Sequence, residues 1–331
     1  MPAGPPIEFV VEPEAQGERL DQFVRRRIPG LSRGSLTRLL DKGQILVDGR
    51  ERPKGLRLAV GQRVLVAAAA TDERPPAQPE LPLQVLAEHA DLVVVNKPAG
   101  VPCHPLVPGE TDTVANALVA RYPECADASP HPREAGLVHR LDTSTSGVLV
   151  AARNRLSYGT LRALFGNEGV HKTYLALVHG TITRPGEISL ALEGVPGDRT
   201  RVQVVPQERG GTGQAATTRY APVCALGAFT LLRIGCRTGR RHQVRVHLAH
   251  VGHPLVGDLL YGGSPFPGVE GAFLHGLEVT LLGQRFSAPL PAERRRLLET
   301  LGWDGRLGPS PGEAAPATGA ERDRKIEDSS S

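Results

Sequence analysis

The amino-acid sequence predicts an α+β protein in which a small, basic α/β domain precedes a larger domain with a mixed, largely antiparallel sheet. The chain has 331 residues, which is room for about two domains with sizeable cores. The larger part alternates strand-like runs with a few helices and lacks regular βαβ units. Residues 17–66 carry 12 basic and 5 acidic residues, an excess larger than the +4 of the whole chain. This excess sets the small domain apart.

Composition excludes several classes of protein. With 40% hydrophobic and 22% charged residues the chain is globular, and no apolar run approaches the ~20 residues that span a bilayer. The first six residues lack the basic start and apolar run of a secretory signal. Four scattered cysteines without a CxxC pair suit reduced thiols and no structural zinc. We therefore expect a cytoplasmic protein without a membrane span.

The basic segment predicts two short helices followed by strands. Leu20, Phe23, Val24 and Ile28 recur at helical spacing, and a second helix is expected from Ser35, closed by Gly43 as a left-handed cap. Strands are expected at 45–47 and 63–66, with a turn at Asp48-Gly49. The polar faces then carry five basic side chains: Arg25, Arg26, Arg33, Arg38 and Lys42. Such a surface suits RNA phosphates, and an ordinary solvated surface is the alternative.

The remaining boundaries follow from composition. Residues 67–82 are rich in Ala and Pro and are expected to form a linker. Residues 304–331 contain almost no large apolar residues and are expected to be a disordered tail. The segment 83–303 then forms one domain. Its expected strands lie at 92–95, 147–151, 174–178, 229–234 and 273–281. Its expected helices lie at 113–122, with Thr111 or Thr113 as the cap, and at 155–165 and 240–251.

Common cofactor and metal signatures are absent from the sequence. There is no GxxxxGK[ST] and no glycine cluster between a strand and a helix, so ATP and NAD are not expected. No GxSxG or SxxK pattern marks a serine nucleophile. His247 and His250 share one helical face, yet no HExxH accompanies them. We predict no cofactor and no metal, with a metal-dependent hydrolase built on these histidines as a remote alternative.

The densest group of polar residues is HRLDTSTSG at 139–147, directly before the apolar strand at 148–150. A carboxylate, an arginine and three hydroxyl residues beside a core are costly to place there unless they have a use. A solvated turn, whose hydroxyls only satisfy backbone amides, is the competing interpretation. The residues by themselves leave both open.

These motifs resemble those of known RNA-modifying proteins. HRLDTSTSG is similar to the HRLDxxTSG signature of the RluA-type pseudouridine synthases. Three further blocks agree in order: VVVNKPAGVPCHP, HKTYLALVHG and TGRRHQVRVHLAHVGHPLVGDLLYGG. The segment 17–66 resembles the alpha-L RNA-binding domain, a usual partner in this family. The resemblance implies the pseudouridine synthase fold and isomerisation of uridine to pseudouridine in RNA, without a cofactor or metal.

The resemblance also implies roles for individual residues. Asp142 matches the catalytic carboxylate, which either attacks the ribose anomeric carbon or removes a sugar proton. Tyr174 matches a tyrosine that packs on the target base, and Arg245 an arginine that pairs with the carboxylate. Arg140 matches the arginine that fills the place of the flipped base, and Arg240 is a further expected RNA contact. Arg25, Arg33, Arg38 and Lys42 are expected to bind RNA through the small domain.

The target is less specified than the reaction. Large-subunit ribosomal RNA is favoured over tRNA, and a monomer is expected. The stretch after Glu193, with Gln214, and the Gly276 that follows His275 depart from the family wording. The alternative of another class is an RNA-binding assembly factor that keeps the fold without catalysis.

Overall fold

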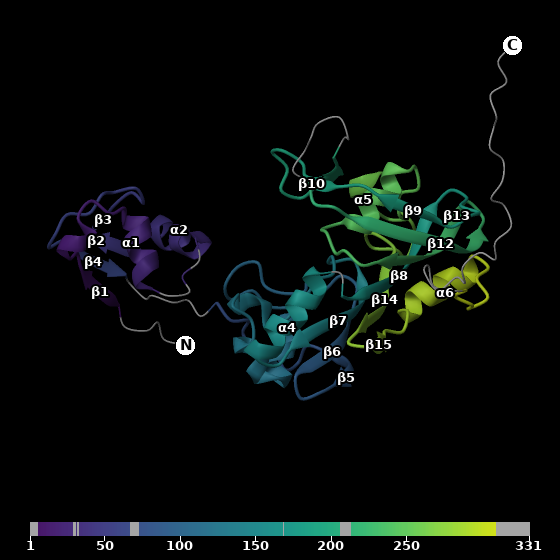
Figure 1. Cartoon of the computed structure of the whole chain (residues 1–331), viewed down its shortest axis with the longest axis horizontal. Helices are drawn as coiled ribbons and strands as arrows, with labels where there is room; N and C mark the ends of the chain where they lie inside the picture. Colours follow the sequence, from purple (N-terminus) through teal and green to yellow (C-terminus); the bar gives the residue numbers. More distant parts are fainter. Residues whose placement is uncertain are drawn as a thin grey trace, which may run out of the picture. The chain divides into compact units, whose positions relative to one another are not determined.

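The computed structural model describes residues 6–28, 31, 33–66, 73–167, 169–205 and 213–308. The chain divides into two units: Met1–Glu73 with Val107–Gly109, and Arg74–Leu106 with Glu110–Ser331. Figure 1 shows each unit with its own sheet and helices. No helix in the described part of the chain is long and apolar enough to cross a membrane.

The first unit packs two helices on a four-stranded antiparallel sheet. Its elements are β1 (Ile7–Val10), a 3-10 turn (Pro13–Ala15), α1 (Leu20–Arg27), α2 (Arg33–Asp41), β2 (Ile45–Val47), β3 (Arg50–Glu51) and β4 (Arg63–Val66), with strand order β1-β4-β2-β3. The apolar face of α1, with Leu20, Phe23 and Val24 fully buried, packs against Ile45 and Val64 of the sheet. The predicted helices and strands are confirmed, and α2 begins two residues before Ser35.

Two turns in this unit confirm their sequence signals. Gly43 ends α2 with a φ of +63°, a conformation that glycine adopts without strain. Asp48 and Gly49 have φ values of +50° and +74°, as a tight two-residue hairpin between β2 and β3 requires. Strand β1 pairs with β4 and was not predicted from the sequence. It precedes Gly17, where the small domain was predicted to begin.

The basic side chains of the first unit are partly committed to ion pairs. Arg26 pairs with Glu18 at 2.7 Å, and Arg27 pairs with Glu12. Arg25 and Lys42 are exposed. Arg33 and Arg38 belong to α2, but their side chains lie outside the described part of the structure.

The second unit is built on a mixed, mostly antiparallel sheet, as predicted. In the described residues its strands are β5 (Gln84–Glu88), β6 (Leu92–Lys97), β7 (Ser146–Ala152), β8 (His171–His179), β9 (Gly186–Ser189), β12 (Thr217–Leu226), β13 (Phe229–Cys236), β14 (Leu274–Leu281) and β15 (Gln284–Ser287). Their order is β5-β6-β7-β14-β8-β13-β12-β9, and β15 pairs with β14. Among these described strands, β7 and β14 are the pair that runs parallel, through the pairs Ser146–His275 and Gly147–Gly276.

Glycine permits this parallel contact. A Cβ added to Gly147, whose φ is +125°, would lie 2.1 Å from the Gly276 carbonyl oxygen. No larger residue fits without moving one of the two strands. The close approach therefore joins the two antiparallel halves of the sheet, and it lies at the end of the HRLDTSTSG segment.

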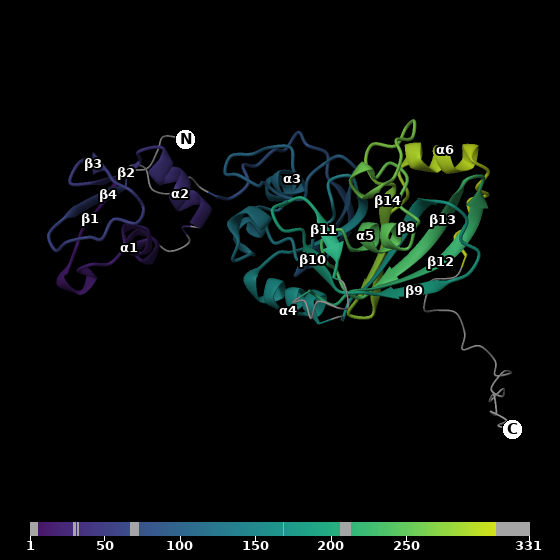
Figure 2. The ribbon, with the colours of Figure 1, turned by 90° about the horizontal axis from the view of Figure 1, so that it is seen from above.

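Helices cover both faces of the β5–β6–β7 half of the sheet (Figure 2). On one side α4 (Arg155–Gly166) packs Tyr158 and Leu161 against β7, and on the other α3 (Val114–Arg121) packs Leu118. This two-sided cover explains the uninterrupted apolar run of β7, in which all seven residues are buried. Thr113 caps α3 through a reciprocal bond with Asn116, which decides between the two predicted caps.

The other half carries α5 (Gln243–His250), α6 (Ala292–Thr300), the hairpin β10 (Leu192–Gly194) and β11 (Val202–Val204), and a 3-10 turn (Leu259–Tyr261). Two further 3-10 turns, Pro123–Asp127 and Pro132–Glu134, follow α3. The helix expected from Arg240 begins later, at Gln243, because His242 has a φ of +54° and breaks the helical path.

Part of the expected linker and tail is ordered against the second unit. Asn116 of α3 donates to the Pro76 carbonyl at 2.8 Å, so the end of this segment is attached. Trp303 is buried, and Arg233 donates to the Gly308 carbonyl at 2.8 Å. Residues 67–72 of the expected linker and 309–331 of the expected tail lie outside the described residues.

Candidate active site

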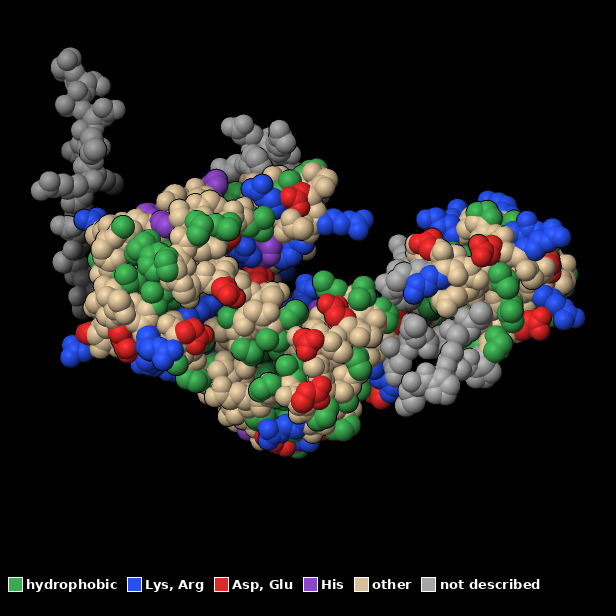
Figure 3. Space-filling view, turned by 180° about the vertical axis from the view of Figure 1, so that it is seen from behind, with side chains coloured by type: hydrophobic (Ala, Val, Ile, Leu, Met, Phe, Trp, Pro, Cys, Tyr) green, Lys and Arg blue, Asp and Glu red, His purple; other side chains and the backbone are tan. Residues whose placement is uncertain are grey.

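The second unit contains a cleft of about 1010 Å³ that opens beside the parallel pair of strands. Figure 3 shows this hollow, with Lys, Arg and His side chains at its edge. An inner pocket at one end is lined by Asp142 and Thr145 of the loop before β7, Tyr174 of β8, Cys236 of β13, Leu274 of β14 and Arg245 of α5, together with Arg140, Leu141, Thr238, Gly239, Arg240, His242, Gln243 and Val244. Asp142 is the one carboxylate in this lining.

Two buried cations hold the loop that carries Asp142. Lys97 at the end of β6 is fully buried and donates from Nζ to the carbonyls of Pro98, Thr143 and Thr145 at 2.8–2.9 Å. Arg294 of α6 is also buried and donates to the Ser144 carbonyl at 2.8 Å from the other side. Three consecutive residues after Asp142 are thereby fixed through their backbones.

Burial makes both cations easier to deprotonate. Desolvation lowers the pKa of Lys97 from 10.5 to about 8, and it lowers the pKa of Arg294 to about 10. Both remain charged at neutral pH, because their positive charge is met by carbonyl oxygens. The Lys97 ammonium is close to its titration point in slightly alkaline solution.

A buried arginine links Asp142 to a second carboxylate. Arg245 Nη1 donates to Asp142 Oδ2 at 3.1 Å, while its Nε and Nη2 donate to the two oxygens of Asp258 at 2.7 and 2.8 Å. Asp258 is 1% exposed. Burial lowers the pKa of Arg245, but the hydrogen bonds and charges of Asp258 and Asp142 outweigh it and raise the pKa above its ordinary value. The guanidinium is a permanent cation with a fixed plane.

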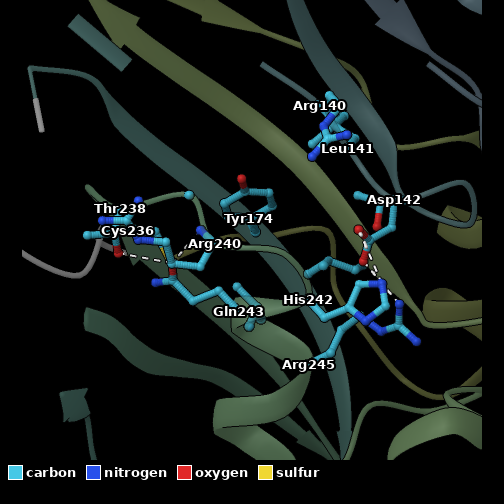
Figure 4. A pocket seen from close by; sticks show the side chains of 14 residues that line it. Arg140, Leu141, Asp142, Tyr174, Cys236, Thr238, Arg240, His242, Gln243 and Arg245 are labelled. Atoms are coloured by element: carbon cyan, nitrogen blue, oxygen red, sulfur yellow. Dashed lines mark hydrogen bonds and ion pairs between the residues drawn. The ribbon is translucent and has the colours of Figure 1, made fainter. Parts of the chain in front are cut away.

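His242 and Tyr261 complete the surroundings of this pair. The Tyr261 hydroxyl accepts from the Val202 amide at 2.9 Å and lies 2.8 Å from His242 Nδ1, while its ring lies 5.1 Å from the Arg245 guanidinium carbon. His242 Nε2 lies 3.9 Å from Asp142 Oδ1. Burial lowers the pKa of His242 although Asp142 raises it, so the imidazole is neutral at neutral pH. Figure 4 shows Asp142, His242 and Arg245 converging on one another.

Tyr174 lines the same pocket and is half-buried in its wall. Desolvation, with smaller contributions from Cys236 and Asp142, raises the pKa of its hydroxyl above 10. The phenol is therefore neutral and presents a flat apolar ring with one polar end. Such a ring provides a surface on which a planar base can stack.

The structure brings together the predicted residues Asp142, Tyr174 and Arg245. Arg140 and Arg240 line both the pocket and the cleft. Arg140 is exposed and lies apart from the Asp142 group in Figure 4, whereas Arg240 donates from Nε to the Ala215 carbonyl at 3.2 Å. The four expected RNA contacts Arg25, Arg33, Arg38 and Lys42 belong to the first unit and not to this site.

The histidines have structural partners. His139 accepts from the Val150 amide at 3.1 Å and stacks on Phe165, and burial lowers its pKa to about 3. His247 is buried against Thr218 and the Leu190 carbonyl, whereas His250 is exposed. In the described ranges, no three His, Cys, Asp or Glu side chains gather in a way that could hold a metal ion.

Sequence reasoning missed Asp258, Lys97, Arg294 and Tyr261. Lys97 lies in the block VVVNKPAGVPCHP, and Asp258 and Tyr261 lie in VGDLLYGG, so two of the resembling blocks already contained them. A charged residue at the end of an apolar strand was an available signal for Lys97. Arg294 lies outside every motif that was recognised in the sequence.

The pocket combines one carboxylate, a neighbouring cation and an aromatic ring on which a base can stack. This combination is typical of enzymes that act on the glycosidic bond of a nucleoside. The sequence matches the RNA pseudouridylate synthase family over residues 91–250. The ribosomal large subunit pseudouridine synthase D of Xylella fastidiosa is 36% identical over 326 residues, which cover 92% of this chain and 95% of that protein. Its namesake from Escherichia coli is 32% identical over 306 residues, 86% and 91% of the two chains.

Among solved structures, human RNA pseudouridylate synthase domain containing 4 superposes with a TM-score of 0.52 at 23% identity, over 66% of this chain and 92% of that one. This likeness confirms the fold. The chain belongs to the RNA pseudouridylate synthase family and is an RNA pseudouridine synthase, an isomerase that acts on RNA. The predicted family, fold and class of reaction are confirmed.

Proposed function

We propose that this enzyme converts specific uridines of large-subunit ribosomal RNA to pseudouridine, with Asp142 as the catalytic carboxylate. The observation that carries the site assignment is the Asp142–Arg245 pair at 3.1 Å in a pocket without another carboxylate. The ribosomal target rests on the names of relatives that align with this chain over most of their length.

The reaction moves the uracil from an N1–C1′ bond to a C5–C1′ bond. Asp142 either attacks C1′ as N1 departs, or removes a proton from the sugar so that N1 departs from the resulting species. The uracil then turns and forms the C5–C1′ bond, and the proton on C5 is lost while N1 gains one. Atoms balance without an oxidant, a reductant or a cofactor.

Arg245 keeps Asp142 ionised in this scheme. A neighbouring cation favours the charged form of a carboxylate when the substrate displaces water. Tyr174 packs against the uracil ring, because its half-buried aromatic ring lines the pocket. These three residues form the proposed catalytic set.

Arg140 is proposed to occupy the space that the flipped nucleotide leaves in the RNA. Extruding a base from structured RNA costs about a few kcal/mol, part of which an inserted guanidinium returns by stacking and phosphate contact. Its exposure at the mouth of the pocket supports this role. Binding of Arg140→Ala should be impaired on intact RNA and normal on RNA with an abasic target position; equal impairment on both RNAs would contradict the role.

The same proposal assigns a role to each segment of the chain. Residues 17–66, extended by β1, are an alpha-L domain that holds RNA through Arg25, Arg33, Arg38 and Lys42, and Arg240 contacts RNA at the cleft. Residues 67–82 are the linker, 83–303 the catalytic domain and 304–331 a tail. We propose a cytoplasmic monomer, because its substrate is ribosomal RNA and its basic surface faces RNA rather than a second copy.

Release of tritium from C5-labelled uridine in unmodified ribosomal RNA tests the function. Wild type should release tritium from large-subunit RNA, and Asp142→Asn should release none. Arg245→Ala should also be nearly inactive, whereas activity within a few-fold of wild type would contradict its role. Release from tRNA alone would move the target to tRNA. Retained RNA binding without release from either RNA would favour an assembly factor.

A further inference from the structure

Thr145 has a buried hydroxyl that the protein itself does not satisfy. The residue is 1% exposed, and its Oγ1 has no hydrogen-bond partner among the described residues. Its backbone, by contrast, is fully used: the amide donates to the Asp142 carbonyl at 2.9 Å and the carbonyl accepts from Lys97 at 2.8 Å. An unpaired buried hydroxyl is destabilising, and native proteins rarely retain one.

Thr145 is among the residues that line the inner pocket, as is Asp142. Two other neutral polar side chains of this lining, Thr238 and Gln243, already have hydrogen-bond partners in the protein. Thr238 donates to Gln243 Oε1 at 3.0 Å and accepts from the Thr217 amide, and the Gln243 amide nitrogen donates to the Thr217 carbonyl at 3.0 Å. Of these three side chains, Thr145 is the one whose buried hydroxyl keeps hydrogen-bonding capacity for a group that enters the pocket.

The remaining lining indicates which part of a nucleotide fits. Leu141, Tyr174, Val244 and Leu274 provide apolar surface in the same pocket lining. A planar ring with polar groups at its edge suits such walls, whereas a phosphate or a hydrated ribose does not. Uracil has two carbonyl oxygens and one N–H at its edge, and a threonine hydroxyl can both donate and accept.

The turn that contains Thr145 fixes its distance from the chemistry. Asp142 and Thr145 close one turn through the 2.9 Å bond between their backbones, and Lys97 fixes both Thr143 and Thr145. A group that binds the base edge and a group that acts on the sugar are thereby held on the same rigid segment. A uracil that bonds Thr145 is placed with its glycosidic bond near Asp142.

We propose that Thr145 Oγ1 hydrogen-bonds the edge of the flipped uracil and so contributes to recognition of uridine in the pocket. This inference rests on the proposed function. It makes Thr145 a binding residue for the substrate, in addition to the structural role of its backbone.

The test compares Thr145→Val with Thr145→Ser under the tritium-release assay on unmodified large-subunit ribosomal RNA. Val has nearly the shape of Thr without the hydroxyl, so it should lower kcat/KM by about tenfold or more, because a buried edge of the uracil is left unpaired. Ser keeps the hydroxyl and should stay within about threefold of wild type.

Thermal unfolding of the free enzyme separates this role from a structural one. Since Oγ1 has no partner among the described residues, Thr145→Val should leave Tm unchanged or raise it. The matched variant Thr238→Val removes a hydroxyl that has partners and should lower Tm. If Thr145→Val lowers Tm as Thr238→Val does, the hydroxyl is structural and the proposal fails.

The outcomes also separate this inference from the proposed function. A wild-type enzyme without activity on ribosomal RNA or tRNA refutes the function and the inference with it. An active wild type with Thr145→Val within about twofold refutes the inference alone, since the hydroxyl then bonds only water.

Discussion

Asp258 does not line the inner pocket, yet it determines how Arg245 meets Asp142. Both of its oxygens accept from the guanidinium, at 2.7 and 2.8 Å, so the plane of Arg245 is set and only Nη1 is directed to Asp142. Two bonds to one buried carboxylate orient an arginine more strictly than one bond does. Asp258 is therefore a positioning residue.

We expect Asp258→Asn to reduce kcat by about 10- to 100-fold, because misplacing a group by a fraction of an ångström weakens its effect on the reacting centre. KM should change little, since Asp258 lies outside the pocket lining. Steady-state rates measured over a range of RNA concentrations give kcat and KM for the variant and the wild type. A variant with wild-type kcat would show that Arg245 keeps its position without Asp258.

Loss of a buried ion pair also costs stability, roughly 3 kcal/mol or more. The control is Glu278→Gln, because Glu278 pairs with buried Arg233 at 2.9 Å away from the pocket. Glu278→Gln should lower Tm while keeping kcat. Equal loss of kcat in the two variants would assign the Asp258 effect to stability.

The sequence singled out the proposed catalytic residues and missed the buried residues that contact them or the Asp142 loop. Asp142, Tyr174 and Arg245 were singled out because their motifs resemble a family. Asp258 and Arg294 were not, because their roles depend on pairings across 13 and about 150 positions that no local pattern encodes. Thr145 lay within the motif, but only the structure shows that its hydroxyl has no partner in the described residues.

At the contact of β7 with β14, two glycines differ in the space that is available for a side chain. A Cβ at Gly147 would collide with backbone at 2.1 Å, whereas a Cβ at Gly276 would find its nearest neighbours at 3.5 Å or more. Gly276→Ala should therefore fold and gain up to about 1 kcal/mol through reduced freedom of the unfolded chain. Gly147→Ala should lose several kcal/mol and its activity. Denaturant unfolding of both variants measures the difference, and similar losses would contradict it.

The loop between η3 (Pro132–Glu134) and β7 depends on a lysine that titrates near the working range. As pH rises through about 8, folded Lys97 loses the proton that lets it donate to three carbonyls at once. We expect kcat/KM to fall above about pH 8 for this reason. Lys97→Met should be weakly active but should lack this decline. A wild-type profile that stays level to pH 9.5 would contradict the role.

Local patterns predicted the elements with strong periodicity or capping. The helices α1, α3 and α4 and the strands β6, β7, β8, β13 and β14 agree with them to within a few residues. Among the missed elements, the strands β1 and β9 have only four residues each. Helix α6 has charged residues at five of its nine positions and is buried only through Arg294 and Leu298, so its sequence shows little of an apolar face.

For the whole molecule, buried neutral histidines predict sensitivity to acid. Desolvation lowers the pKa of His139 from 6.5 to about 3 and that of His275 from 6.5 to about 4. Below pH 6.5 the unfolded chain binds protons that the folded chain does not, so this stabilisation is complete above pH 6.5 and is lost as pH falls toward 4 and 3. The two groups together remove about 4 kcal/mol between pH 7.5 and 5.0.

Urea unfolding at these two pH values should show this loss. His275→Asn should reduce the difference by about half, because one of the two groups no longer titrates. His250→Asn, at an exposed position, should leave the difference unchanged. A wild-type free energy of unfolding that is equal at pH 7.5 and 5.0 would overturn the assignment.

The hold of α6 on the Asp142 loop has a consequence for synthesis on the ribosome. Asp142 emerges about 150 residues before Arg294, whose guanidinium must reach back to the Ser144 carbonyl to fix the loop from its second side. A nascent chain can thus contain every proposed catalytic residue while its loop still lacks the contact from α6 and is held by Lys97 and the Gly100 amide. The loop acquires its second buried cation only when α6 has been synthesised and has packed.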